Sequence, residues 1–217
     1  MPTLMVLGTD TEVGKTRVVS SLFGYLSQKN ESVITQKWVQ TGQDDDIAVH
    51  DQQRCSDDNF PVSDRVPYRF KKPASPHLAD TDRCIRFEVI EASLRRLQAA
   101  YHWVIVEGTG GVMVPMNEDD LYIDWVKRLD LRVILVVANR VGAINHSLLS
   151  VNALNQYGIS CLGLVFNQVL ADLDQAVLAD NPRIISQLTG LPVLGSFGYN
   201  QELRSFNWEP CLSVCAL

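Results

Sequence analysis

A glycine, a lysine and a threonine stand together at residues 14–16, and their types and spacing suit the binding of a phosphate group. The surrounding stretch reads Gly8-Thr9-Asp10-Thr11-Glu12-Val13-Gly14-Lys15-Thr16 and lies between an apolar run and a helical pattern. At such a junction the N–H groups of a helix start bind an anion, a lysine reaches the outer phosphates of a nucleotide, and a threonine hydroxyl binds Mg²⁺. The usual loop has four residues between its two glycines, whereas Gly8 and Gly14 are separated by five. The stretch therefore predicts a nucleotide-phosphate site built on an unusual loop.

Two charged residues stand at the ends of apolar runs that we interpret as strands. Lys37 lies near the end of residues 32–40, and Glu107 directly follows residues 103–106. The carboxyl ends of strands border the ligand crevice in an open α/β sheet, so Lys37 could lie beside the phosphate loop. A solvated lysine at the sheet edge is the alternative. An acid after a buried strand needs a cation or hydrogen-bond donors, which makes Glu107 a candidate Mg²⁺ ligand, with a helix-capping acid in a flexible turn as the alternative.

Three adjacent aspartates, Asp44, Asp45 and Asp46, open a predicted helix. Carboxylates complement the partial positive charge of a helix N-terminus, which is one interpretation of the triplet. The other is metal binding, in which one or two of the three side chains face a single Mg²⁺, because neighbouring side chains point in different directions. Further along, Asn167 closes another predicted strand, where its amide could contact a nucleobase or simply form a turn.

Strand and helix patterns alternate along the chain. Apolar runs predict strands at residues 4–7, 32–40, 103–106, 131–138, 160–167 and 191–195. Helical spacing predicts helices that end near residues 28, 101, 130 and 157, and a last helix near residues 181–188. Residues 43–69 are otherwise irregular, residues 70–77 predict a rigid extended loop, and no pattern is visible after residue 197. The alternation predicts one doubly wound α/β domain, residues 1–217, P-loop NTPase-like, with a mainly parallel sheet and helices on both faces.

The composition excludes several classes of protein. Of the 217 residues 46% are hydrophobic, enough for one substantial core, and the formal net charge is -6. This charge argues against broad binding of nucleic acid, whose phosphates require a basic surface. The most apolar long run, residues 133–144, contains Asn139 and Arg140 and is too short to span a membrane. Five scattered cysteines without a C-x-x-C pair, and an N-terminus without a secretion signal, favour a cytoplasmic protein.

Taken together and in this order, the motifs resemble the dethiobiotin synthetase family along the chain up to about residue 196. The matching segments are residues 8–16, Lys37 with Thr41-Gly42, residues 73–79, residues 106–111 with Val114-Pro115, residues 142–146, and Asn167-Gln168. In that family the five-residue spacing of the loop is the normal form.

The resemblance implies an activity. Members of the family are ATP-dependent cyclo-ligases (dethiobiotin synthases) that use Mg²⁺ and convert 7,8-diaminononanoate, CO₂ and ATP into dethiobiotin, ADP and phosphate. One amine captures CO₂ as a carbamate, the γ-phosphate is transferred to it as a carbamic-phosphoric anhydride, and the second amine closes the ring. The resemblance also implies a homodimer with the substrate site at its interface, and no nucleic acid or membrane as a partner.

The resemblance further implies roles for individual residues. Lys37 and Lys15 are the implied catalytic residues, and the implied Mg²⁺ ligands are Thr16, Asp46 and Glu107. The implied nucleotide contacts are Glu12, Val13, Gly14, Lys15, Thr16, Arg17, Asp46, Glu107, Gly108, Thr109, Gly110, Asn167, Gln168, Gly198 and Tyr199. The implied substrate contacts are Thr11, Lys37, Thr41, Val114, Pro115, Ala143, Ile144 and Asn145.

Two positions depart from the family pattern, and two other classes of protein are alternatives. Trp38 stands where the family usually has proline, and residues 197–199 lack the proline usual in the adenine-binding turn, which is followed by a tail that includes Glu202. The alternatives are a cobyrinic-acid-type amide synthase and a deviant P-loop switch ATPase. The first normally carries a glutaminase domain, for which this chain has no room. The second places a lysine near the start of the loop, where this sequence has Asp10.

Overall fold

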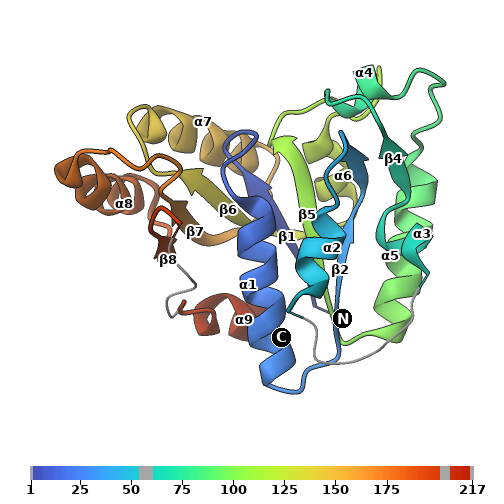
Figure 1. Ribbon diagram of the computed structural model, residues 1–217, viewed down its shortest axis with the longest axis horizontal. Coiled ribbons are helices and arrows are strands. Elements are labelled where there is room, and N and C mark those ends of the chain that lie inside the picture. Colours follow the sequence, from blue (N-terminus) through green and yellow to red (C-terminus); the bar gives the residue numbers. More distant parts are fainter. Residues whose placement is uncertain (1, 54–60, 201–205, 216–217) are drawn as a thin grey trace.

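A parallel sheet forms the centre of the molecule (Figure 1). The computed structural model describes residues 2–53, 61–200 and 206–215. Over these ranges the sheet has six strands: β1 (Thr3–Gly8), β2 (Val33–Lys37), β5 (Trp103–Gly111), β6 (Arg132–Ala138), β7 (Cys161–Asn167) and β8 (Val193–Phe197). Their order is β2-β5-β1-β6-β7-β8, and every neighbouring pair is parallel. Because the chain builds first one side of β1 and then the other, the structure confirms the doubly wound α/β class.

Helices cover both faces of this sheet. One face carries α1 (Lys15–Gln28) and α9 (Glu209–Cys215), and the other carries α5 (Phe87–Ala100), α6 (Tyr122–Arg128), α7 (Ala143–Gln156) and α8 (Gln175–Thr189). Leu4 and Val6 of β1 enter the core on the first face. Met5 and Leu7 enter the core on the second, because successive side chains of a strand point to opposite faces. A strand buried on both sides reads as a continuous apolar run, which is what the sequence shows here.

The single strand predicted for residues 32–40 is wrong, because the chain leaves the main sheet at Trp38. β3 (Val39–Thr41) instead pairs with β4 (Tyr68–Phe70) in a separate two-stranded parallel sheet. The Trp38 side chain is fully buried and stacks on Tyr122 of α6, with the ring centroids 4.9 Å apart. The large apolar area that this indole removes from water favours the change of direction between the two strands.

The strand predicted for residues 103–106 is longer in the structure, since β5 continues to Gly111, and Glu107 lies inside it and not in the flexible turn given as the alternative. Glu107 is paired with Val6 of β1. A Cβ atom on Gly108 would lie 2.6 Å from Leu7 Cδ2, so the absence of a side chain there lets the two strands stay together. The glycines extend the strand instead of ending it.

The C-terminal part contains more helix than the sequence pattern indicates. α9 lies after residue 197, where we predict no regular element. α8 begins well before residue 181, because the Asp174 side chain accepts a hydrogen bond of 2.8 Å from the backbone N–H of Ala176 and so caps the helix. Pro182 lies inside α8 and has no N–H to offer the carbonyl of Leu178. That carbonyl accepts a hydrogen bond of 3.0 Å from Asn139 Nδ2 instead. A contact from a distant strand end therefore compensates for a residue that normally breaks a helix.

The described residues between β3 and α5 include three short helices: α2 (Asp46–Asp51), α3 (Val62–Arg65) and α4 (Pro76–Ala79). The helix predicted at the aspartates is α2, whereas α3 and α4 fall in stretches predicted to be irregular or extended. Within the ranges given above, we find no helix that combines the length and the apolar character needed to cross a membrane.

Candidate active site

The stretch of residues 8–16 joins the end of β1 to the start of α1, as a phosphate-binding loop does. Gly14 precedes the helix with φ 98°, a left-handed conformation that favours glycine. A Cβ atom on Gly14 would lie 2.3 Å from Asn167 Nδ2, so glycine also makes room for the end of β7. Val13 is buried beside it, whereas Thr11 and Glu12 are exposed. The loop thus leads into a helix N-terminus whose first N–H groups are available to an anion.

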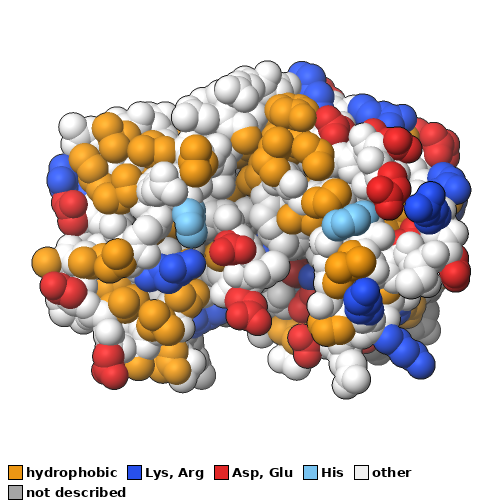
Figure 2. All heavy atoms as spheres, turned by 90° about the horizontal axis from the view of Figure 1, so that it is seen from above, with side chains coloured by type: hydrophobic (Ala, Val, Ile, Leu, Met, Phe, Trp, Pro, Cys, Tyr) orange, Lys and Arg blue, Asp and Glu red, His pale blue; other side chains and the backbone are white. Residues whose placement is uncertain are grey.

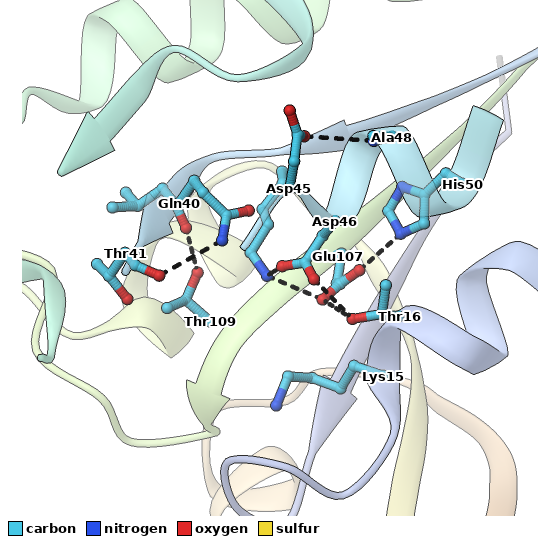
Figure 3. A network of polar contacts seen from close by, with 12 residues as sticks. Lys15, Thr16, Gln40, Thr41, Asp45, Asp46, Ala48, His50, Glu107 and Thr109 are labelled. Carbon is cyan, nitrogen blue, oxygen red and sulfur yellow. Dashed lines mark hydrogen bonds and ion pairs between the residues drawn. The ribbon is translucent and has the colours of Figure 1, made fainter. Parts of the chain in front are cut away.

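Four polar side chains from four elements meet beside the start of α1 (Figure 3). Thr16 Oγ1 lies 3.0 Å from Glu107 Oε1 and 3.1 Å from Asp46 Oδ1, so its hydroxyl can donate to either carboxylate. Lys37 Nζ donates to Glu107 Oε1 at 2.9 Å and also to Asp46 Oδ2. We call these four residues the carboxylate cluster. It brings together the three residues expected to bind Mg²⁺ and the lysine expected to act on the reacting groups.

Lys37 and Glu107 keep each other ionised inside the protein. Only 6% of Lys37 and 1% of Glu107 is exposed, which excludes the alternative of a solvated lysine at the sheet edge. Burial alone raises the pKa of Glu107, but the Lys37 ammonium group and the hydrogen bond from His50 outweigh it and lower this pKa to about 2. Burial also opposes the charge on Lys37, yet Glu107 and Asp46 hold its pKa above the usual lysine value. Glu107 therefore remains a carboxylate across the physiological pH range.

Lys15 points away from the carboxylates in this structure (Figure 3). Its Nζ donates to the backbone oxygen of Asp10 at 2.9 Å. Burial lowers the pKa of Lys15 to about 8, although the charge of Glu107 opposes the shift. Because its hydrogen-bond partner is a neutral carbonyl, Lys15 can turn toward a phosphate without breaking an ion pair.

The start of α2 determines which of the three adjacent aspartates enters the cluster. Asp45 precedes the helix, and its side chain accepts a hydrogen bond of 3.2 Å from the backbone N–H three residues later. Asp46 is the first helical residue and contacts Thr16 and Lys37, whereas Asp44 is exposed. The helix-capping interpretation thus applies to Asp45, and Asp46 is the aspartate whose carboxylate enters the cluster.

His50 also belongs to this site, although no motif indicates it. The side chain is fully buried, and Nε2 lies 2.7 Å from Glu107 Oε2. His50 stands four residues after Asp46 and therefore on the same face of α2. That spacing, next to a predicted metal ligand, is the sequence signal that could have identified it.

Arg17 and Asn167 form a second polar group on the β7 side of the loop. Arg17 Nη1 donates to Asn167 Oδ1 at 3.2 Å and to the carbonyl of Gly198 at 3.3 Å, and its guanidinium lies 4.2 Å from the ring centroid of Phe197. Asn167 Nδ2 donates to the carbonyl of Val13 at 3.0 Å. Each end of the Asn167 amide has one protein partner, and one N–H group and one oxygen lone pair remain for a nucleobase.

Gln168 and Tyr199 continue this side of the site. Gln168 Oε1 accepts a hydrogen bond of 3.4 Å from the Tyr199 N–H, and the Tyr199 side chain is exposed. Glu202, in the tail, lies outside the described residues.

Three of the residues expected to contact the substrate lie near the ends of β3 and β5: Thr41, Val114 and Pro115. Thr109 Oγ1 donates to the Val39 carbonyl at 2.6 Å and so ties β5 to β3, the strand that ends at Thr41. Gly110 has φ 70°, and a Cβ atom there would lie 2.8 Å from Val114 Cγ2. The Val114 carbonyl accepts a hydrogen bond from the start of α6, and Pro115 forms a β-bridge across the same turn. The segment is therefore anchored at both of its ends.

The start of α7 lies at the carboxyl end of β6 but apart from the carboxylate cluster. Ala143 is buried, whereas Ile144 and Asn145 are exposed. Among the residues with a described position, no hydrogen bond or ion pair joins this helix start to the cluster. Figure 2 shows this end of the molecule, where apolar side chains gather on both sides of a middle zone that carries acidic groups.

The donor atoms of the cluster fit Mg²⁺. Two carboxylates and one hydroxyl are the hard oxygen ligands that this cation prefers. Across the described ranges there is no group of three or more His, Cys, Asp or Glu side chains that could hold a metal ion. A cation at the cluster would therefore take its remaining ligands from water and from nucleotide phosphates, as Mg²⁺ usually does.

A parallel sheet with a glycine-lysine-threonine loop after β1, with Glu107 in the neighbouring strand β5 and Asp46 at the start of α2, defines a P-loop NTPase-like protein. A ParA family ATPase from Chlorobium tepidum has a similar structure, with a TM-score of 0.57 over 98% of this chain and 89% of that chain. The two are 14% identical, so this likeness shows the fold alone.

Sequence comparison identifies the family. A family model described as an AAA domain matches residues 2–206. The ATP-dependent dethiobiotin synthetase of Halalkalibacterium halodurans is 35% identical over 92% of this chain and 86% of its own length. That of Chlorobaculum tepidum is 37% identical over 84% of this chain and 79% of its own length. The chain belongs to the ATP-dependent dethiobiotin synthetase family, as its motifs predict, and is an ATP-dependent ligase of biotin biosynthesis.

Proposed function

We propose that this chain, as a single domain in the cytoplasm, forms the ureido ring of dethiobiotin from 7,8-diaminononanoate, CO₂ and ATP. One amine nitrogen attacks CO₂ and loses a proton, which gives a carbamate. A carbamate oxygen attacks the γ-phosphorus of ATP, and ADP leaves. The second amine then attacks the carbamoyl carbon of the mixed anhydride and loses a proton, and phosphate leaves as the ring closes.

The meeting of Lys37 with Asp46 and Glu107 beside the phosphate loop is the observation that carries this proposal. Negative charge develops on the carbamate and on the transferring phosphoryl group, so a fixed cation next to these oxygens lowers the barrier. Two carboxylates orient the Lys37 ammonium group, and Lys15 can turn from its loop carbonyl to the phosphates. We assign both lysines as catalytic.

We assign Thr16, Asp46 and Glu107 to Mg²⁺. The ion, when bound, would neutralise charge on the phosphate oxygens. The low pKa of Glu107 supports this assignment, since a metal ligand must be ionised.

The other contacts follow the family pattern and stay predictions. For the nucleotide these are Glu12, Val13, Gly14, Arg17, Gly108, Thr109, Gly110, Asn167, Gln168, Gly198 and Tyr199. For the diamine these are Thr11, Thr41, Val114, Pro115, Ala143, Ile144 and Asn145. We place the last three across the interface of a homodimer. The exposed apolar side chains of Val141 and Ile144 at the start of α7 support an interface there.

Carbon-labelled bicarbonate tests the proposed reaction. The pure protein is incubated with 7,8-diaminononanoate, Mg-ATP and the label, and the product is acidified. A carbamate decomposes in acid, whereas a ureido ring keeps the label. We expect acid-stable labelled dethiobiotin and an equal amount of ADP, both dependent on the diamine. If ADP forms without any acid-stable label, the proposal is wrong.

A further inference from the structure

His50 is completely buried, and only one of its two ring nitrogens has a partner in the described part of the chain. Nε2 lies 2.7 Å from Glu107 Oε2, whereas Nδ1 is buried without a hydrogen bond. A buried polar atom that lacks a partner costs free energy, and a leucine would fill similar space without that cost. Packing alone therefore does not explain a histidine at this position.

The hydrogen bond to His50 separates the roles of the two Glu107 oxygens. Oε2 contacts His50, while Oε1 faces Thr16 at 3.0 Å and Lys37 at 2.9 Å. The terminal torsion of a glutamate has a broad, weak preference by itself, so the carboxylate orientation depends on its partners. With Oε2 held from the α2 side, Oε1 stays directed to the phosphate loop (Figure 3).

We propose that His50 is a positioning residue, which holds Glu107 Oε2 so that Oε1 faces the cation and Thr16. This inference rests on the proposed function, because it takes Glu107 as a Mg²⁺ ligand. Residues that orient a metal ligand through a hydrogen bond commonly change metal affinity by about 10–100-fold when they are replaced. α2 then contributes two residues to the site: Asp46 faces the cation directly, and His50 acts through Glu107.

Three substitutions at this position separate positioning from packing. His50→Gln places an amide N–H near the position of Nε2. His50→Asn places it near the position of Nδ1, out of reach of Glu107, and His50→Leu removes it. Mn²⁺ is the probe, and its binding to each variant saturated with a non-hydrolysable ATP analogue is measured by electron paramagnetic resonance. We expect affinity to fall about tenfold in the Asn and Leu variants and the Gln variant to recover most of that loss.

Ile47→Val is the matched control. Ile47 is buried in the same helix but has no polar contact with Glu107. This change should lower the thermal midpoint while Mn²⁺ affinity stays near that of the wild type. Equal affinities for the Gln and Asn variants would overturn the inference, and so would a loss in Ile47→Val as large as that in His50→Leu. If His50→Leu does not fold, the difference in Mn²⁺ affinity between His50→Gln and His50→Asn still tests the inference.

Enzyme assays separate this inference from the proposed reaction. The half-saturating Mg²⁺ concentration for dethiobiotin formation should rise in the Asn and Leu variants and return toward the wild-type value in the Gln variant. A wild-type protein that makes no dethiobiotin would contradict the proposed function. The Mn²⁺ affinities of the variants would still test whether His50 positions Glu107. Unchanged Mg²⁺ dependence in all three variants of an active enzyme would contradict the inference alone.

Discussion

At the scale of single residues, Lys37 forms ion pairs with Asp46 and Glu107 where little water can solvate its ammonium group. Removing one partner of a buried pair typically costs about 3–5 kcal/mol, whereas apolar groups of the same volume are often as stable as the intact pair. Stability therefore gives no reason for these charges. The proposed reaction gives such a reason, because negative charge would develop on phosphoryl and carbamate oxygens beside this lysine.

Lys37→Ala should lower kcat by about 10²–10³-fold and change the Kd for Mg-ATP much less, because Lys15 and the loop N–H groups would still hold the phosphates. Steady-state rates and calorimetric titration of ATP measure the two effects. Lys71→Ala, which removes an exposed lysine, is the control and should change neither. Wild-type turnover in Lys37→Ala would assign Lys37 a purely structural role.

Lys15 should take up a proton when ATP binds at alkaline pH. Its pKa is about 8 instead of the usual 10.5, so the buried charge costs stability below about pH 8, and this cost disappears as the pH rises toward 10.5. Phosphates beside Nζ favour the charged form and raise the pKa again. Calorimetry of ATP binding in buffers of different ionisation enthalpy should show proton uptake at about pH 9 and little near neutrality. Lys15→Arg, which is always charged, should abolish the uptake; uptake that persists there comes from another group.

At the scale of elements, the first turns of two helices bring a hydroxyl and a carboxylate of the site within hydrogen-bond distance. α1 presents Thr16 in its first turn, and α2 presents Asp46 in its own. The two side chains meet because both helices begin at the carboxyl edge of the sheet. The backbone that leads into α1 must therefore hold its conformation closely, and Gly14 is the residue on which this depends.

Gly14→Ala should weaken ATP binding, and Gly142→Ala is the matched control. Both glycines precede a helix with positive φ, 98° and 91°, so alanine strains either site by about 1–2 kcal/mol. At Gly14 the new Cβ atom would lie 2.3 Å from Asn167 Nδ2, whereas at Gly142 no described residue has an atom within 4 Å of it. We expect both thermal midpoints to fall and ATP affinity to drop about tenfold only in Gly14→Ala, a difference of ~1.4 kcal/mol. Equal ATP affinities of the two variants would show that the phosphate loop tolerates the contact between the new Cβ atom and Asn167.

At the scale of the whole molecule, the end of the sheet that carries the site also carries exposed apolar side chains (Figure 2). Val141 is 74% exposed, and Met113 is 48% exposed. Both follow strands that end beside the phosphate loop. Exposed apolar side chains grouped in this way often mark an interface, and a two-fold dimer uses the same surface on both subunits.

Val141→Asp should dissociate the proposed dimer, because a charge would be buried against its partner surface. Leu188→Asp is the control: Leu188 is 56% exposed, but it lies in the last turn of α8, outside the proposed interface. Sedimentation velocity should find a monomer for Val141→Asp and a dimer for the control. The rate of dethiobiotin synthesis should fall in the variant that no longer forms the dimer. If the Val141→Asp variant is still a dimer, the subunit interface does not include the start of α7.

The sequence by itself determined the features that depend on neighbouring residues. The loop is recognisable because its glycines, Lys15 and Thr16 act through their positions along one short segment. The strands are recognisable because burial on both faces requires continuous apolar runs. Glu107 was identifiable as a site residue because an acid after a buried strand needs a positive partner. These signals were sufficient for the fold class and for most of the carboxylate cluster.

Only the tertiary structure decided the features that depend on contacts between distant residues. Trp38 ends β2 because its indole packs on Tyr122, far along the chain. Pro182 is tolerated in α8 because Asn139 takes the carbonyl that the proline leaves free. The spacing of four residues from Asp46 puts His50 on one face of α2, but only the packing of α2 brings it to Glu107 of β5. Local sequence propensity does not indicate any of these contacts between distant residues. The physical reason for each of the three features lies in packing and hydrogen bonds that exist only after the chain has folded.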